Sequence, residues 1–194
     1  MERRGFFSLL AGMSTGLCMA RMAGTAQAQS LRPTPSCPDG AQPTPRQTAG
    51  PYFKPHSPER ASLLEPGMPG MKIVVTGMVR LANCQPVPRA LIDVWHADDR
   101  GAYDNAGFRL RGHQYTDDQG RYRLETIVPG NYPGRTRHFH VNVQAPKGPV
   151  LTTQLYFPGE AGNAGDPIFS RELVLRVQDG AEVRAATFDF VLRA

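Results

Sequence analysis

The sequence has 194 residues, enough for one domain of ordinary size. Glycine and proline number 20 and 18, about a fifth of the chain, which disfavours a helical bundle, and the absence of a Gly-X-Y repeat excludes collagen. The net charge of +5 comes without a cluster of Lys and Arg interleaved with aromatic residues, so no nucleic-acid partner is expected, while 40% apolar residues suffice for one core.

The composition of residues 1–28 predicts an export signal. They combine a charged start, an apolar middle and a small-x-small end at Ala28. The pair Arg3 and Arg4 resembles the twin-arginine type of leader, which exports folded proteins. Arg21 argues against the alternative, a retained membrane anchor, because a charge among acyl chains costs about 2.5–3.5 kcal/mol. We expect cleavage after Ala28, a periplasmic or secreted protein, and no stable membrane insertion afterwards.

Residues 29–70 are predicted to form an extended, proline-rich arm. Ten of the eighteen prolines lie between Pro33 and Pro69, which rules out a regular helix or an inner strand there. Two cysteines remain outside the leader, Cys37 and Cys84. An even count in an exported protein predicts one disulfide, with a stabilisation of about 4 kcal/mol, and two unrelated thiols are the alternative.

The pattern of residues 71–194 predicts one domain of the all-β class. Short runs rich in β-branched and aromatic residues alternate with turn residues, and no helical period separates them. This spacing favours a single β-sandwich of mostly antiparallel strands with long loops. The candidate strands are residues 72–81, 89–96, 120–127, 137–144, 151–157, 172–178 and 183–192.

Two histidines share one face of the strand predicted over residues 137–144. Side chains alternate across a strand, so His138 and His140 point to the same side, while Phe139 and Val141 point to the other, as a core side should. Two imidazoles on one face can bind one metal ion. The His-x-His pattern by itself also occurs with structural histidines and in zinc, copper and cupin-type iron sites, so it does not identify the metal.

A tyrosine rather than a carboxylate lies close to this pair in the sequence. No Asp or Glu occurs between Glu125 and Glu160, although zinc sites often use one and facial-triad iron(II) sites need one. Tyr132, in contrast, precedes His138 by six residues. A tyrosine hydroxyl titrates near about 10 and becomes a ligand only where a strongly polarising cation displaces its proton. Iron(III) is such a cation, and phenolate ligands stabilise it over iron(II).

Further segments form a series around the histidine pair. They are Thr48–Phe53, Ile92–Tyr103, Thr116–Tyr122, Tyr132–His140 and Thr153–Phe157. Together, and in this order, they resemble the intradiol ring-cleavage dioxygenases, the family of the protocatechuate and catechol dioxygenases. The likeness runs from about residue 46 to residue 160.

This resemblance implies one mononuclear, non-haem iron(III) ion, Fe(III). Its four protein ligands would be Tyr103, Tyr132, His138 and His140. The implied reaction uses O2 to cleave a catechol-type aromatic diol between its two hydroxyl-bearing carbons, giving a cis,cis-muconate-type dicarboxylate. Tyr132 matches the ligand that leaves the metal when the diol arrives and helps to take its proton. Arg135 matches an arginine that stabilises carbanion-like charge on the ring, and Gln154 matches a glutamine near the metal.

Other side chains have different expected roles. Trp95 and His96 are expected to pack and to form hydrogen bonds beside the first ligand loop, while Tyr115 and Tyr156 are expected to line the pocket. The spacing between Tyr132 and the histidines is shorter than in the larger members of the family, which also carry a helical N-terminal region. A second hypothesis remains: a non-catalytic binding module of transthyretin-like or carboxypeptidase-regulatory type, which would share the sandwich and its turns.

Overall fold

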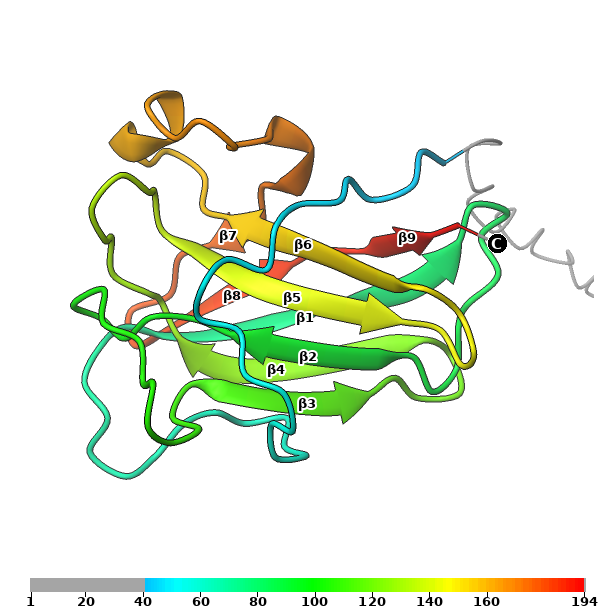
Figure 1. The fold of residues 1–194 in the computed structure, drawn as a ribbon, viewed down its shortest axis with the longest axis horizontal. Coiled ribbons are helices and arrows are strands. Elements are labelled where there is room, and N and C mark those ends of the chain that lie inside the picture. The colour runs from blue at the N-terminus through cyan, green and yellow to red at the C-terminus, as the bar shows by residue number, and fades with distance from the viewer. Residues whose placement is uncertain (1–40, 194) are drawn as a thin grey trace, which may run out of the picture. The chain divides into compact units, whose positions relative to one another are not determined.

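The computed structural model describes residues 41–193, which form two β-sheets packed face to face (Figure 1). The strands are β1 (Lys72–Leu81), β2 (Leu91–Trp95), β3 (Arg111–Tyr115), β4 (Arg121–Ile127), β5 (His138–Gln144), β6 (Val150–Tyr156), β7 (Arg176–Gln178), β8 (Val183–Thr187) and β9 (Phe190–Leu192). One sheet has the order β4-β1-β8-β7, with β9 also paired to β1, and the other has the order β3-β2-β5-β6. Two 3₁₀ helices, η1 (Ala161–Ala164) and η2 (Arg171–Leu173), follow β6.

The strand pairing is mostly antiparallel. Among the strands of the described residues, β1 pairs in parallel with β8 and with β9, whereas β2, β3, β5 and β6 are antiparallel neighbours. The predicted all-β sandwich is therefore confirmed. Within the described residues, no helix has the length and apolar character that a membrane-spanning helix needs.

The core lies between the two sheets and follows the alternation of side chains along each strand. On β5, Phe139, Val141 and Val143 are almost fully buried and join one apolar cluster with Val75 of β1 and Leu124 of β4. Because successive residues of a strand point to opposite faces, this leaves the other face of β5 for polar side chains. The β3-β2-β5-β6 sheet thus carries the core on one side and the candidate site on the other.

One strand was missed by the sequence prediction, and two of the predicted strand runs were wrong in extent. Strand β3 was not predicted, because its residues are mostly polar and lack a β-branched run. The run predicted over residues 183–192 is two strands, β8 and β9, separated at Phe188 and Asp189. Phe188 N–H still donates to the Thr76 carbonyl at 3.0 Å, and Asp189 Oδ1 accepts from Met78 N–H at 3.0 Å, so the break stays attached to β1. The run predicted over residues 172–178 contains η2 and only the short strand β7.

Residues 41–70 contain no strand or helix of their own. Residues 47–60, here called the crossing segment, cross the outer face of the β3-β2-β5-β6 sheet (Figure 1). Gln47 N–H donates to the Thr152 carbonyl of β6 at 2.8 Å, and His113 N–H of β3 donates to the Pro58 carbonyl at 3.0 Å. This segment therefore runs from one edge strand of the sheet to the other. Residues 1–28 and Cys37 lie outside the described residues, so the leader and the Cys37–Cys84 disulfide stay predictions.

Candidate metal centre

Strand β5 places His138 and His140 side by side on the outer face of its sheet. Both side chains are buried, and their Nε2 atoms lie 3.1 Å apart. Two nitrogens bound at about 2.1 Å and at right angles to one ion would be about 3.0 Å apart. The separation of the two imidazoles therefore fits two adjacent positions in one coordination shell.

The hydrogen bonds and the burial of these histidines favour the neutral, metal-binding form. His138 Nδ1 lies 2.7 Å from the Thr136 carbonyl oxygen, which can only accept, so Nδ1 carries the proton and the Nε2 lone pair points to His140. Burial lowers the pKa of His138 to about 4. Burial, and then the neighbouring His138, holds the pKa of His140 well below its usual value. Both rings are thus neutral near pH 7, as a ligand must be.

Two loop tyrosines complete the cluster. The ring of Tyr132 lies 5.6 Å from that of His138, the ring of Tyr103 lies 6.2 Å from that of His140, and the two tyrosine rings are 5.8 Å apart. Burial and the neighbouring Tyr132 raise the pKa of Tyr103, and burial also raises the pKa of Tyr132, although Arg135 opposes it. Neither hydroxyl would therefore ionise near neutral pH without a cation beside it.

The glycine at position 101 allows the loops that bear Tyr103 and Tyr132 to meet. A Cβ on Gly101 would lie 2.1 Å from the Asn131 carbonyl oxygen, and the φ of Gly101 is +86°. Gly130 N–H donates to the Asp98 carbonyl at 2.7 Å, which joins the same two loops. The loop before Tyr103 thus packs directly against the loop that bears Tyr132, and a side chain at Gly101 would separate them.

Aromatic rings hold the cluster from two sides. Tyr52, from the crossing segment, stacks on Tyr103 with ring centroids 4.3 Å apart and planes at 16°. Trp95, at the end of β2, stacks on His140 with centroids 5.1 Å apart and planes at 2°. These contacts fix the planes of one tyrosine and one histidine. Trp95 therefore has the packing role that was predicted for it. His96 forms the predicted kind of hydrogen bond, between its Nε2 atom and Thr126 Oγ1 at 2.7 Å.

Arg135 connects the cluster with β6. Its Nη2 donates to Gln154 Oε1, and its Nη1 lies 3.4 Å from the Tyr132 hydroxyl. Gln154 is fully buried and donates from Nε2 to the Thr48 carbonyl at 3.0 Å. Tyr156 Oη lies 3.4 Å from Arg135 Nη2, so Tyr156 lies beside Arg135, and its place in a pocket wall stays a prediction. The structure therefore brings Arg135 and Gln154 to the four predicted ligands.

Two charged residues at the site were missed at the level of sequence. Asp166 accepts from Arg135 Nε at 2.8 Å. Arg111 is buried beside Tyr103, with its Cζ atom 5.9 Å from the ring centroid, and donates from Nη1 to the Tyr52 carbonyl at 2.6 Å. Neither belongs to a spacing pattern around the histidines. The one signal in the sequence was that Arg135 has no Asp or Glu close to it in the chain, so its ion-pair partner had to come from a distant segment.

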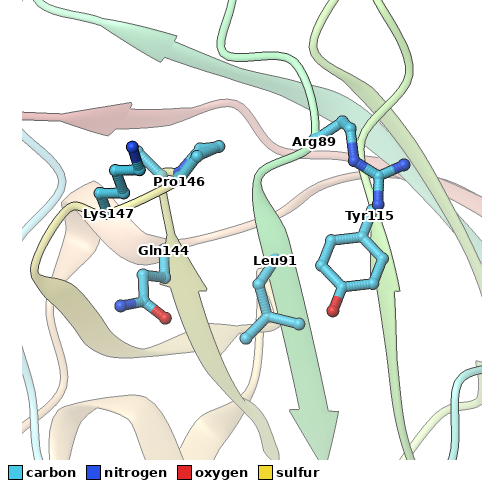
Figure 2. Close-up of a pocket in the computed structure, with 7 residues that line it drawn as sticks. Arg89, Leu91, Tyr115, Gln144, Pro146 and Lys147 are labelled. Atoms are coloured by element: carbon cyan, nitrogen blue, oxygen red, sulfur yellow. The ribbon is translucent and has the colours of Figure 1, made fainter.

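Tyr115 does not lie at the cluster, contrary to expectation. It is opposite Leu91 on β2, whereas His140 is opposite Trp95, four residues away or roughly 13 Å along the strand. Tyr115 instead borders a separate hollow of about 400 Å³, where Arg89 stacks on its ring (Figure 2). The hollow is lined by Arg89, Leu91, Tyr115, Gln144, Ala145, Pro146 and Lys147.

The donor atoms fit a ferric ion. Among residues 41–193, no group of three or more His, Cys, Asp or Glu side chains is arranged to hold a metal ion, so a metal at this cluster would need the tyrosines. The Tyr103 hydroxyl and His140 Nδ1 are buried without a hydrogen-bond partner in the described part of the chain. A buried hydroxyl without a partner is costly, and a hard cation that takes its oxygen as phenolate would remove that cost.

Comparison with known proteins gives matches over most of the chain. The family model Dioxygenase_C, described as "Dioxygenase", matches residues 48–194. The protocatechuate 3,4-dioxygenase beta chain of Burkholderia cepacia is 38% identical over 118 residues, 52% of this chain and 50% of that protein. Catechol 1,2-dioxygenase 2 of Acinetobacter lwoffii is 30% identical over 176 residues, 74% of this chain and 62% of that protein. The chain thus spans only about half to three fifths of these relatives.

The chain also matches one solved structure over almost the whole length of that structure. The dioxygenase domain of a dioxygenase and carbohydrate-binding protein fusion from Streptomyces sp. SirexAA-E is 53% identical, with a TM-score of 0.77. The match covers 79% of this chain and 99% of that domain.

Proposed function

The chain belongs to the intradiol ring-cleavage dioxygenase family, and we propose that it is itself an iron(III) dioxygenase. Its substrate is a catechol-type aromatic diol, cleaved with O2 between the two hydroxyl-bearing carbons to a cis,cis-muconate-type dicarboxylate. The relatives' names give protocatechuate and catechol as the first compounds to assay.

One observation carries this proposal: two neutral imidazoles and two tyrosine rings meet at one point, with the His138 and His140 Nε2 atoms 3.1 Å apart. A bound iron(III) ion would supply the Lewis acidity that binds a diol as its dianion and draws electron density from its ring. A transthyretin-like binding module would have no need for these four side chains to converge. The cluster therefore supports the enzyme over the module.

The two tyrosines differ in ways that suit different roles. Tyr103 is stacked on Tyr52 and its hydroxyl is buried, so it is the ligand that stays in place. Tyr132 makes edge contacts to its aromatic neighbours and lies 3.4 Å from a guanidinium nitrogen of Arg135. A positive charge at this distance would stabilise Tyr132 as a phenolate. The phenolate oxygen would be able to accept a proton from the diol.

In this proposal Arg135 stabilises negative charge on the substrate ring, and Gln154 orients Arg135. The Arg135 guanidinium is held between Gln154 Oε1 and the Tyr132 hydroxyl, so it is fixed beside the position that the ring would take. A fixed cation in a partly dry site stabilises negative charge as it develops on the ring carbons. Gln154 in turn is held by the Thr48 carbonyl and orients the arginine.

We also propose that the protein acts outside the cytoplasm, on the basis of the twin-arginine-like leader in residues 1–28. Fractionation of cells that express the full chain, followed by N-terminal sequencing, tests this proposal. The expected mature protein starts at Gln29, and replacement of Arg3 and Arg4 by lysine should retain the full-length chain in the cytoplasm.

Iron loading tests the proposed function. Tyrosinate bound to iron(III) gives a strong visible colour through charge transfer from ligand to metal. The purified protein should bind about one iron per chain and become coloured. A colourless protein that retains no iron after loading with Fe(III) would favour the binding-module hypothesis instead.

A further inference from the structure

Asp166 lies in the segment between η1 and η2 and has a fully buried side chain, 0% exposed. Its carboxylate accepts three hydrogen bonds: from Arg135 Nε at 2.8 Å, from Thr136 N–H at 3.1 Å, and from Ile168 N–H at 3.0 Å. Burial opposes its ionisation, but the Ile168 amide and the Arg135 guanidinium hold the pKa of Asp166 below its usual value. The side chain is therefore an anion with a defined orientation.

The partner of this anion faces the candidate metal centre. The Arg135 side chain is only 15% exposed, and its Nε edge is occupied by Asp166. The two Nη atoms are thereby directed at Gln154 Oε1 and at the hydroxyls of Tyr132 and Tyr156. A guanidinium is planar, so a bond at Nε fixes the plane in which both Nη atoms lie.

Asp166 does not reach the centre itself. Its hydrogen bonds go to Arg135, Thr136 and Ile168, and none of these is among the four candidate ligands. Arg135 is the side chain that links Asp166 to the centre. A second route passes through the backbone of Thr136, whose N–H donates to Asp166 and whose carbonyl accepts from His138 Nδ1, so the test has to separate the two routes. Without the carboxylate, the Arg135 side chain would regain rotamer freedom, and the plane of its guanidinium would no longer be fixed at Nε.

We propose that Asp166 is a positioning residue of the active site, which fixes the Arg135 guanidinium in the direction where it stabilises charge on the substrate ring. This inference rests on the proposed function. It assigns a mechanistic role to a residue of the segment between η1 and η2.

A matched control exists in the same two segments of the chain. Arg137 Nε lies 3.1 Å from Glu160 Oε2, so this second ion pair also joins the Arg135 loop to the segment after β6. The variant E160Q removes that pair without touching Arg135. D166N should lower kcat by ~10- to 100-fold with a KM change below about threefold, while iron content and colour stay as in the wild type. E160Q should leave kcat unchanged.

A double-mutant cycle separates positioning from a general structural effect. If Asp166 acts through Arg135, D166N should cause no further loss of kcat in an R135M background. Equal fold-losses of kcat in both backgrounds would overturn the inference, as would a D166N enzyme with wild-type kcat. If D166N does not fold, D166E replaces it: the longer carboxylate keeps the charge but displaces the guanidinium, so kcat should still fall.

A second readout is independent of turnover. In the metal-free, ¹⁵N-labelled protein, the Arg135 Nε–H should exchange slowly with solvent, and D166N should accelerate this exchange at least tenfold while E160Q leaves it unchanged. Unchanged exchange in D166N would contradict the pairing. Wild-type protein that binds iron but consumes no O2 with any catechol would overturn the proposed function, whereas an active wild type with a fully active D166N would overturn only the role of Asp166.

Discussion

Gly50 packs directly against the imidazole of His140. A Cβ at this glycine would lie 3.2 Å from His140 Cε1 and 3.6 Å from Nε2, and the φ of Gly50 is +67°. The crossing segment can therefore approach the candidate metal centre closely only because this residue has no side chain. Gly67 has a similar φ of +72° but no atom within 4 Å of its Cβ position, so it offers a matched control.

Replacing Gly50 by alanine should affect both stability and metal binding. Both G50A and G67A place a Cβ at positive φ, which costs about 1–2 kcal/mol of unfolding free energy. Only G50A should also displace His140, and it should therefore weaken iron binding and shift the visible band. Urea unfolding and an iron titration check this. Equal iron affinity in the two variants would show that the Gly50 contact does not constrain His140.

The two tyrosines should respond differently to loss of the hydroxyl. Y103F removes the proposed ligand that is fixed by stacking on Tyr52, so the protein should lose most of its iron. Y132F removes the proposed ligand that is held less tightly, so iron should be retained with a shifted colour. Metal analysis and visible spectra of both variants check the assignment, and full iron content in Y103F would be incompatible with it.

Acid should reveal the contribution of Asp166 to stability. Its folded-state pKa lies below the usual value of 3.8, so its stabilising effect is present above that pH and is lost as pH falls through the folded-state value. D166N should lower the unfolding free energy by about 1–3 kcal/mol at neutral pH. The difference from the wild type should then shrink below pH 3.8. A difference that is constant with pH in denaturant titrations would argue against an ionised, paired Asp166.

The alternation of side chains along β5, which places Phe139 in the core, leads to a separate prediction about stability. Phe139 lies on the core face, 0% exposed, between the two candidate histidine ligands. F139A should lower the unfolding free energy by about 3–5 kcal/mol. Val150, on the neighbouring strand and 38% exposed, should tolerate alanine within about 0.5 kcal/mol. Similar effects of the two changes on the melting curve would mean that β5 does not bury Phe139 as described.

Much of the fold could be predicted because its strands alternate between apolar and polar residues. The run predicted over residues 137–144 corresponds to β5, His138–Gln144, since an apolar core face alternates there with histidines. Strand β3 could not be found in this way. Both faces of Arg111–Tyr115 carry polar residues, because the crossing segment covers its outer side and bonds to His113.

The candidate site was predictable where a local pattern or a family motif existed. His138 and His140 share a strand face, and the two tyrosines lie in segments that resemble the family. Asp166 was not predictable, because it meets Arg135 across 31 residues and stands alone in a loop. Arg111 was missed for a similar reason: its partners are the backbone carbonyls of Tyr52 and Asp104, which leave no signature in side-chain type.

Analysis of the reaction product is the most direct test of the proposed ring cleavage. The iron-loaded protein is incubated with catechol and isotopically labelled O2, and the product is identified by mass spectrometry and NMR. We expect a cis,cis-muconate-type dicarboxylate that contains both atoms of the labelled O2, formed by the wild type and not by H138A. Unchanged catechol, or a ring opened beside rather than between the hydroxyl-bearing carbons, would contradict this expectation.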